Sequence, residues 1–299
     1  MKFGLAAHLF QGFVDNPDWV RAFVQTIEAA GAESLWVSEH PIIAPDHKPL
    51  YTYSKSGRPG FTPGITFPSP LEWLSFCAAV SSKLKLVTGV LLLPLHSPII
   101  VAKRISTLDR LSKGRLILGV GLGWQIEEFE SVGVPYAERG RRMDEMIPAL
   151  RALWRDSPAT FEGNYYAFKS VDCDVKPVQP GGPKIMIGGS TKPAAERAAR
   201  LGDAYYPYAI GPDEYASLIE TLRAKAKQLG RNPDEIELTA APAFWREGGG
   251  KSLDLGLARA YAQSGVSRLL FNSMEADSQD MKDIERFIKT YRDQIIERL

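Results

Sequence analysis

Two ionisable residues end an apolar run near the N-terminus of this 299-residue chain, where residues 35–40 read LWVSEH. A histidine at the end of a buried strand, here His40, can exchange a proton with a substrate because an imidazole titrates near neutral pH. The alternative is a structural histidine that is hydrogen-bonded to a loop carbonyl. Successive side chains of a strand alternate between its faces, so Glu39 points away from His40. Both are catalytic candidates, but we favour a structural ion pair as the role of Glu39.

A second candidate site follows a later apolar run, in the segment IMIGGSTKPAAERAARLG over residues 185–202. Gly188 and Gly189 allow the backbone to come close to a ligand, and Ser190 or Thr191 begins a helix whose free N–H groups attract an anion. These four residues are therefore candidates for binding a cofactor phosphate. An ordinary strand-to-helix turn with a serine cap is the alternative.

The segment GVGLGW, residues 119–124, invites comparison with the GxGxxG fingerprint of dinucleotide-binding folds. Its spacing is GxGxG and no distinct acidic residue follows about 20 positions later, so a Rossmann site is disfavoured. Close approach of this segment to a bound ring is the better interpretation, which makes Gly121 and Trp124 candidate cofactor contacts. The four histidines do not pair at metal-ligand spacing, no GxSxG motif is present and no lysine ends an apolar run to form a Schiff base. No metal site is expected.

Eight apolar or β-branched runs alternate with helical segments, a pattern typical of a parallel sheet. In a chain of this length the pattern predicts an α/β fold, a (β/α)8 TIM barrel, rather than an open doubly wound sheet. The active site of such a barrel lies at the C-terminal ends of its strands, so His8 and Thr88 join the candidate cofactor contacts. Ser69, Pro70 and Glu72 predict a helix start with a capping box. The expected strands cover residues 2–8, 34–40, 84–93, 115–123, 184–189, 203–208, 235–242 and 267–272.

Two insertions depart from a minimal barrel. Residues 41–68 are rich in Pro and Gly, and loops of this length in compact domains are usually lids or binding loops. Tyr51, Tyr53 and Phe61 make this insertion a predicted lid over an apolar or planar substrate. Residues 158–182 form the second insertion, in which FEGNYYAF predicts a short hairpin. No linker or repeat divides the chain, so we expect a single domain over its whole length.

The composition argues for a small-molecule partner. Thirty-six Lys and Arg residues balance 35 Asp and Glu residues with the signs interspersed, which disfavours nucleic acid and an anionic membrane surface as partners. No apolar stretch approaches the roughly 20 residues of a membrane helix and no secretory signal is evident, so a cytoplasmic location is expected. Cys77 and Cys173 are interpreted as structural thiols.

Three segments together resemble the bacterial luciferase-like oxidoreductases, and more narrowly the branch that depends on the deazaflavin coenzyme F420. They are SLWVSEHPII with the aromatic-rich loop after it, VTGVLLLPLHSPIIVAKRISTLDRLSKGRLILGVGLGW and IMIGGSTKPAAERAARLGD. The similarity runs from residue 1 to about residue 290. The second segment is the most specific of the three.

The resemblance implies a flavin or deazaflavin across the C-terminal mouth of a (β/α)8 barrel. The third strand of this family tends to carry a bulge with a non-proline cis peptide that supports the back of the ring, and the matching bond here is Gly89–Val90. His40 matches the family histidine implicated in proton transfer. Gly188 to Thr191 match the region that holds the cofactor phosphate.

The resemblance favours coenzyme F420 and leaves FMN as the alternative. In the flavin-dependent branch an arginine contacts the flavin phosphate, and Leu122 stands at the matching position. With F420, the enzyme would transfer a hydride to or from a small organic substrate, with His40 as proton donor or acceptor. With FMN, it would be a monooxygenase that uses FMNH2 and O2 and depends on a reductase partner. A flavin-binding barrel without turnover stays open, and a homodimer is expected because relatives often dimerise.

Overall fold

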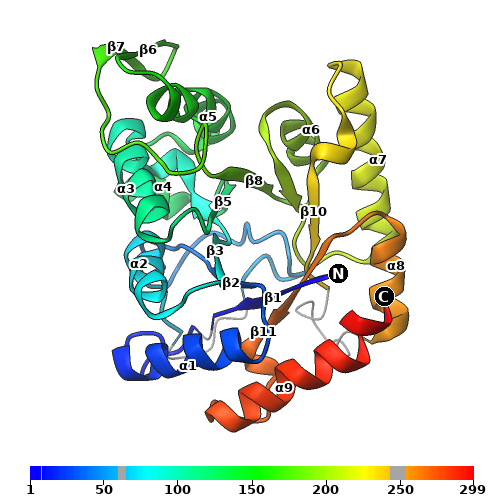
Figure 1. Ribbon diagram of the computed structural model, residues 1–299. Helices are drawn as coiled ribbons and strands as arrows, with labels where there is room; N and C mark the ends of the chain where they lie inside the picture. Colours follow the sequence, from blue (N-terminus) through cyan, green and yellow to red (C-terminus); the bar gives the residue numbers. More distant parts are fainter. Residues whose placement is uncertain (8, 60–64, 243–253) are drawn as a thin grey trace.

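Eight parallel strands close into a barrel in this computed structural model, which describes residues 1–7, 9–59, 65–242 and 254–299 (Figure 1). The order around the barrel is β3-β2-β1-β11-β10-β9-β8-β5, and pairing of β3 with β5 closes it. The short strand β4 continues β3 after a break and also pairs with β5. The predicted (β/α)8 barrel is confirmed. Its strands are β1 (Lys2–Ala6), β2 (Ser34–Val37), β3 (Lys85–Thr88), β4 (Leu91–Leu92), β5 (Leu116–Gly121), β8 (Lys184–Gly188), β9 (Ala204–Tyr206), β10 (Glu237–Ala240) and β11 (Arg268–Asn272).

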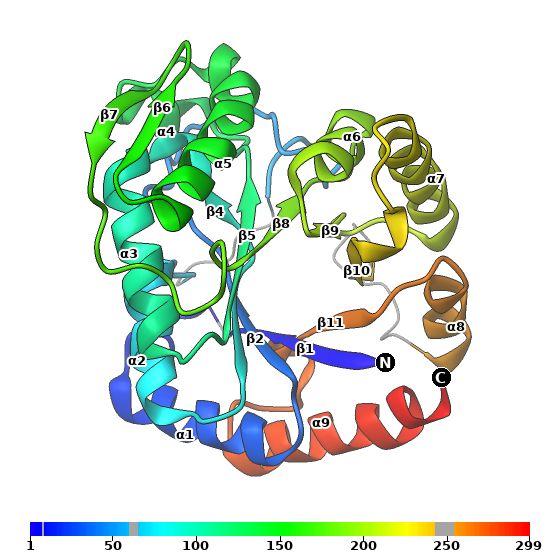
Figure 2. The ribbon, with the colours of Figure 1, turned by 45° about the horizontal axis from the view of Figure 1, so that its top comes forward.

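The helices form a ring around the barrel, as Figure 2 shows. All of the α-helices except the short α4 (Ile126–Ser131) contribute apolar residues to the larger buried cluster of the protein, which lies between them and the outer face of the strands. The α-helices are α1 (Pro17–Ala29), α2 (Pro70–Val80), α3 (Pro98–Leu111), α4 (Ile126–Ser131), α5 (Arg139–Arg155), α6 (Lys192–Leu201), α7 (Pro212–Gln228), α8 (Leu255–Gln263) and α9 (Met281–Gln294). The 3-10 helices are η1 (Leu93–Leu95), η2 (Tyr136–Glu138), η3 (Pro233–Glu235), η5 (Ser273–Glu275) and η6 (Ile296–Arg298).

The helix start predicted at Ser69 is confirmed, whereas its capping box is wrong. Ser69 is the N-cap of α2 and Pro70 is its first residue, but the serine side chain accepts no bond from the first turn. Its hydroxyl contacts the carboxylate of Glu72 instead. Arg104 of α3 binds the same carboxylate, with 3.0 Å between Nε and Oε1, so the glutamate is turned toward the neighbouring helix.

A second buried cluster fills the barrel itself. Its members belong to inward-facing positions of the strands, which alternate with the outward-facing positions beneath the helices. Ala6, Val90 and Tyr208 are only partly buried and pack onto this cluster. They come from the C-terminal ends of β1, β3 and β9 at the barrel mouth, and we call Ala6 and Val90 the floor of the mouth. The cluster consists of Trp36, Val87, Ile117, Met186, Ala204, Tyr206, Ala241 and Leu270.

The break between β3 and β4 lies where the resemblance placed a bulge. β3 ends at Thr88, β4 begins at Leu91, and the Gly89–Val90 bond between them is cis, as predicted. The backbone N–H of Glu39 donates to the Val90 carbonyl at 3.2 Å, which joins the bulge to the end of β2. The bulge thus lies at the mouth of the barrel.

The two predicted insertions differ in their structure. The second contains an antiparallel hairpin of β6 (Ala159–Glu162) and β7 (Ala167–Val171), which confirms the prediction for FEGNYYAF and lies beside α5 (Figure 1). The described part of residues 41–68 forms turns and carries a single isolated bridge, between Phe10 and Ile65.

Within the described ranges, no helix is both long and apolar enough to cross a lipid bilayer. Cys77 and Cys173 are both buried and unbridged.

Candidate active site

His40 lies three residues beyond β2 and is held by a carboxylate from another element. Its Nδ1 is 3.0 Å from Oε1 of Glu128, which belongs to the first turn of α4. The glutamate side chain is fully buried, and the imidazole is 11% exposed. Phe67 packs edge-to-face against the imidazole, with 4.8 Å between the ring centroids. The proton-transfer candidate is therefore fixed in position by a partner that the sequence analysis did not select.

Glu39 faces the opposite way and is engaged by the bulge. Its Oε2 accepts from the backbone N–H of Leu92 at 2.7 Å, and Nε2 of His96 lies 3.0 Å from the same oxygen and 3.1 Å from Oε1. Both contacts join β2 to the chain that returns after the bulge. The geometry gives Glu39 the structural role that the strand alternation favoured.

Two glycines at the mouth, Gly121 and Gly188, leave room for the side chain of Val90. A Cβ on Gly121 would lie 2.4 Å from Cγ2 of Val90, and one on Gly188 would lie 2.7 Å from Cγ1 of the same valine. Strands β5 and β8 therefore need glycine here because Val90 projects between them. Thr88 is fully buried below this level, and its hydroxyl donates to the Gly119 carbonyl at 2.7 Å. These predicted cofactor contacts support the floor of the mouth from within the barrel wall.

The turn from β8 into α6 uses both of its hydroxyl side chains for folding. Gly189 has a φ of +126°, a conformation that L side chains rarely adopt. The Ser190 hydroxyl donates to the Tyr208 carbonyl at 2.7 Å and accepts from its N–H at 2.8 Å, while the Thr191 hydroxyl caps α6. Among the described residues, none accepts a hydrogen bond from the backbone N–H groups of Ser190, Thr191 and Lys192. An anion at this turn would therefore be held by backbone N–H groups.

Five side chains at the mouth form a connected cluster that we call the aromatic cover. His47, Tyr51 and Tyr53 come from the predicted lid, whereas Trp124 follows β5 and Tyr208 follows β9. Trp124 is at its centre, 5.0 Å from His47 and 5.3 Å from Tyr51 between ring centroids, and the contacts continue from Tyr51 to Tyr53 (5.3 Å) and from Tyr53 to Tyr208 (5.0 Å). Burial, with Tyr53 nearby, raises the pKa of Tyr51, so this phenol is a neutral hydrogen-bonding group. His40 adjoins the cover, because its ring centroid is 5.8 Å from that of Trp124.

The start of α4 holds the root of the lid. Gln125 is fully buried, its Oε1 accepts from the N–H of Ala44 at 3.2 Å, and its Nε2 donates to the Ile42 carbonyl at 3.1 Å. Oε1 of Glu127 accepts from the N–H of Lys48 at 3.0 Å. Two residues of one segment, Gln125 and Glu127, thus fix the chain that follows His40.

Buried polar atoms without a partner gather around Trp124. Seven such side-chain atoms occur in the described residues. Four are connected to Trp124: its own Nε1, Nε2 of His47, whose ring contacts Trp124, Oε2 of Glu128, which binds His40, and Nε of Arg139, whose guanidinium lies over the ring of Tyr136, the donor to the Trp124 carbonyl. A fifth, Oε2 of Glu127, belongs to the residue next to Glu128. Buried polar groups are nearly always paired in folded proteins, so this concentration indicates a place where a ligand supplies partners.

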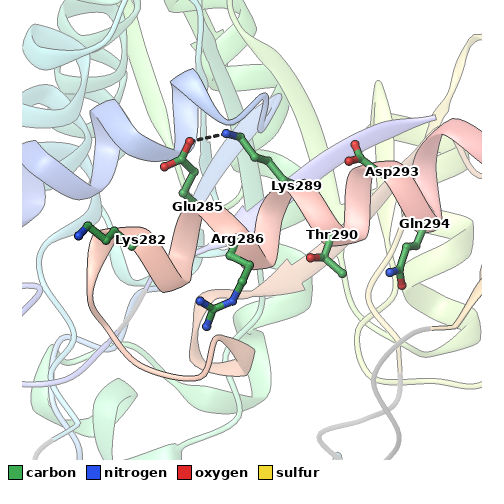
Figure 3. Close-up of a pocket in the computed structure, with 7 residues that line it drawn as sticks. All are labelled: Lys282, Glu285, Arg286, Lys289, Thr290, Asp293 and Gln294. Atoms are coloured by element: carbon green, nitrogen blue, oxygen red, sulfur yellow. Dashed lines mark ion pairs between the residues drawn. The ribbon is translucent and has the colours of Figure 1, made fainter.

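Two predicted contacts, His8 and Phe61, lie outside the described residues. A separate hollow lies on the outer face of α9 (Figure 3), lined among others by Arg286, Lys289 and Asp293. All of its lining residues come from this one helix, and most are exposed. It therefore reads as a solvated helix face, and the barrel mouth stays the candidate site.

Comparison with known proteins agrees with this geometry. A family model for luciferase-like monooxygenases matches residues 1–245. Uncharacterized protein Rv0953c of Mycobacterium tuberculosis is 34% identical over 212 residues, which cover 70% of this chain and 71% of that protein. An FMNH(2)-dependent dimethylsulfone monooxygenase of Pseudomonas putida is 34% identical over 155 residues, which cover 51% of this chain and 42% of the relative.

Solved structures share the fold over nearly the whole chain. The coenzyme F420-dependent tetrahydromethanopterin reductase of Methanopyrus kandleri has a TM-score of 0.75 at 17% identity, covering 99% of each chain. An F420-dependent secondary alcohol dehydrogenase has a TM-score of 0.75 at 18% identity, covering 99% of this chain and 98% of the other. At these identities the likeness concerns the fold.

Proposed function

The chain belongs to the luciferase-like monooxygenase family, and from that premise we propose that it is an oxidoreductase that transfers a hydride between coenzyme F420 and a small organic substrate. His40 is proposed as the residue that moves the accompanying proton. The observation that carries the proposal is the placement of His40 at the mouth, next to the aromatic cover and bonded through Nδ1 to a buried carboxylate. A histidine held in this way is suited to proton transfer at a fixed point.

The residues at the mouth fit a flat cofactor with an anionic tail. Val90 on the floor and Trp124 in the cover are the side chains that would hold the ring, and the backbone amides of residues 190–192 would hold a phosphate. A bound deazaflavin would supply or accept the hydride. During oxidation of an alcohol His40 would accept the hydroxyl proton as the carbon loses its hydride, and during reduction it would return that proton. The aromatic cover would keep water away from the reacting atoms.

One fact supports F420 over FMN, and it comes from the sequence rather than from the shared fold. Leu122 stands where the flavin-dependent branch is expected to carry an arginine for the phosphate, and it is partly buried against the core.

A second candidate function is that of an FMN-dependent monooxygenase. It is favoured by the 34% identity to the FMNH(2)-dependent dimethylsulfone monooxygenase over about half of this chain. In that case the same cover would protect the reduced cofactor from water, and a separate reductase would have to supply FMNH2. A barrel that binds a flavin without turnover remains the third reading.

Titration of cofactor-free protein with F420 and, separately, with FMN tests the proposal. We expect saturable quenching of tryptophan fluorescence by F420 alone. In Trp124→Phe the quenching amplitude should fall while the absorbance change of the bound ring persists, because Trp124 is part of the cover. Saturable binding of FMN alone would replace the proposal with the monooxygenase reading, and binding of neither cofactor would contradict both.

A further inference from the structure

We infer that Glu128 is the positioning residue of His40, and that its carboxylate fixes the imidazole as the Nδ1–H tautomer and so makes Nε2 the basic nitrogen. The assignment of the tautomer stands on the geometry of the pair. Its consequence for turnover rests on the proposed function.

The hydrogen-bond geometry determines which ring nitrogen carries the proton. An ionised carboxylate has no hydrogen and can only accept, so the 3.0 Å contact between Oε1 of Glu128 and Nδ1 of His40 requires the hydrogen on Nδ1. A neutral imidazole has one N–H, and Nε2 is then the nitrogen that can take a proton. Nε2 points away from Glu128 because the two nitrogens lie on different sides of the ring. If His40 gains a proton, the buried carboxylate stabilises the resulting cation.

Burial makes Glu128 suitable for this task. Its side chain has no exposure, and its Oε2 is buried without a partner in the described chain. A carboxylate that served folding alone would be expected to have both oxygens engaged, because an unpartnered buried oxygen costs about 1–3 kcal/mol. One oxygen of Glu128 binds His40, and the other belongs to the group of buried unpartnered atoms around Trp124.

In the described part of the chain, the neighbouring glutamates of α4 make no hydrogen bond with His40, so they provide matched control variants. Glu127 binds the N–H of Lys48 in the root of the lid. Glu130 is on the same helix but is exposed to solvent. Replacement of Glu130 by Gln therefore removes the same charge from the same helix without touching His40.

The test reads the tautomer directly and needs no cofactor. Long-range proton–nitrogen NMR correlations of protein with 15N-labelled histidine distinguish a protonated from an unprotonated ring nitrogen, and the His40 signals are assigned from their loss in His40→Gln. At a pH where the ring is neutral, wild type and Glu130→Gln should show Nδ1 protonated and Nε2 unprotonated. Glu128→Ala should shift both nitrogens toward the Nε2–H form, and Glu128→Asp should restore part of the wild-type pattern.

Two outcomes would overturn the inference. A wild-type ring with its proton on Nε2 would mean that Glu128 is a protonated donor, and His40 signals unchanged in Glu128→Ala would mean that another group sets the tautomer. Glu128→Gln, which keeps the side-chain shape, guards against a misfolded alanine variant. It should lower kcat by about 10–100-fold, by analogy with the cost of losing the partner that orients a metal-binding histidine. If no cofactor binds at all, the proposed function fails while the tautomer assignment is still tested.

Discussion

Two histidine–glutamate pairs flank the end of β2, and they are built from the same groups at the same spacing. His96 and Glu39 approach to 3.0 Å, as do His40 and Glu128. Adjacent residues of the strand end thus contribute the acid of one pair and the base of the other. The two pairs differ in how fully their oxygens are used.

Both oxygens of the Glu39 carboxylate are engaged, and we call this pair saturated in that sense. Nε2 of His96 lies within 3.1 Å of both oxygens, and the N–H of Leu92 donates to Oε2, so the pair joins β2 to the bulge. The Glu128 carboxylate has one engaged oxygen and one buried oxygen without a partner in the described residues. The same two groups, a carboxylate and an imidazole, therefore serve folding in the Glu39 pair, whereas the Glu128 pair leaves one oxygen that a ligand could bind. The comparison teaches that the number of satisfied lone pairs separates these roles better than residue type does.

The largest effect should come from the pair that we assign to chemistry. Replacement of His40 by Ala should reduce turnover by roughly 10²–10⁴-fold because it removes the proton carrier. Cofactor affinity, measured by fluorescence titration, should change little, and so should the free energy of unfolding. Full activity in this variant would remove His40 from the mechanism.

The saturated pair should show the opposite pattern. Glu39→Gln leaves buried partners in Leu92 and His96 imperfectly bonded, so it should lower the free energy of unfolding by about 1–3 kcal/mol. Glu128→Gln should lower it by less than about 1 kcal/mol, because a single bond is altered. Urea unfolding of the two isosteric variants checks this difference, and equal losses would break the comparison.

A substitution at the floor of the mouth should lower the free energy of unfolding by a similar or smaller amount. Gly121→Ala would place a methyl group 2.4 Å from Val90, and overpacking of this kind costs about 1–3 kcal/mol of stability. Adding Val90→Ala should recover most of the loss, since it removes the opposing methyl groups. Gly211→Ala is the matched control, because a Cβ there meets nothing within 4 Å. Lack of rescue in the double variant would show that Val90 does not explain the glycine.

The smallest effect is expected at the start of α6. Thr191→Ala removes the helix cap and should cost about 1 kcal/mol in thermal or urea unfolding. Cofactor affinity should be unchanged if backbone amides hold the phosphate. A large loss of affinity would instead assign the threonine hydroxyl to the cofactor.

The sequence predicted the barrel well because each strand run is a local pattern, whereas the capping box at Ser69 was wrong because Glu72 turns toward Arg104 of the neighbouring helix. The hairpin in the second insertion and the cis bond at Gly89–Val90 also followed from short segments or from the family resemblance. Glu128 could not be found in this way. It lies 88 residues from His40, and nothing in the run Glu127–Glu128 says which carboxylate is buried. The closure of the barrel decides that.

The glycines show a second limit of the sequence. Gly121 and Gly188 were predicted to let the backbone come close to a bound ring or ligand, and in the structure the group nearest to both glycines is Val90 of the protein itself. Which group approaches depends on the bulge of a different strand, which brings Val90 between them. The sequence pattern shows that a side chain is not tolerated at these glycines, but it does not show which group lies against them. For the same reason, the hydroxyls of Ser190 and Thr191 signalled a turn without revealing that the fold uses both.

The attachment of the lid has a consequence for protein engineering. Gln125 and Glu127 fasten the chain at Ile42, Ala44 and Lys48, between His40 and the tyrosine-bearing turn. That turn is braced internally, since the N–H of Tyr51 donates to the Gly57 carbonyl at 2.7 Å. Under the proposed function, the anchored root would therefore separate the residues that select the substrate from those that move the proton. Sequences grafted between residues 49 and 59 should alter which molecules are accepted while leaving the acid–base machinery intact, so this turn is a natural place to diversify a library.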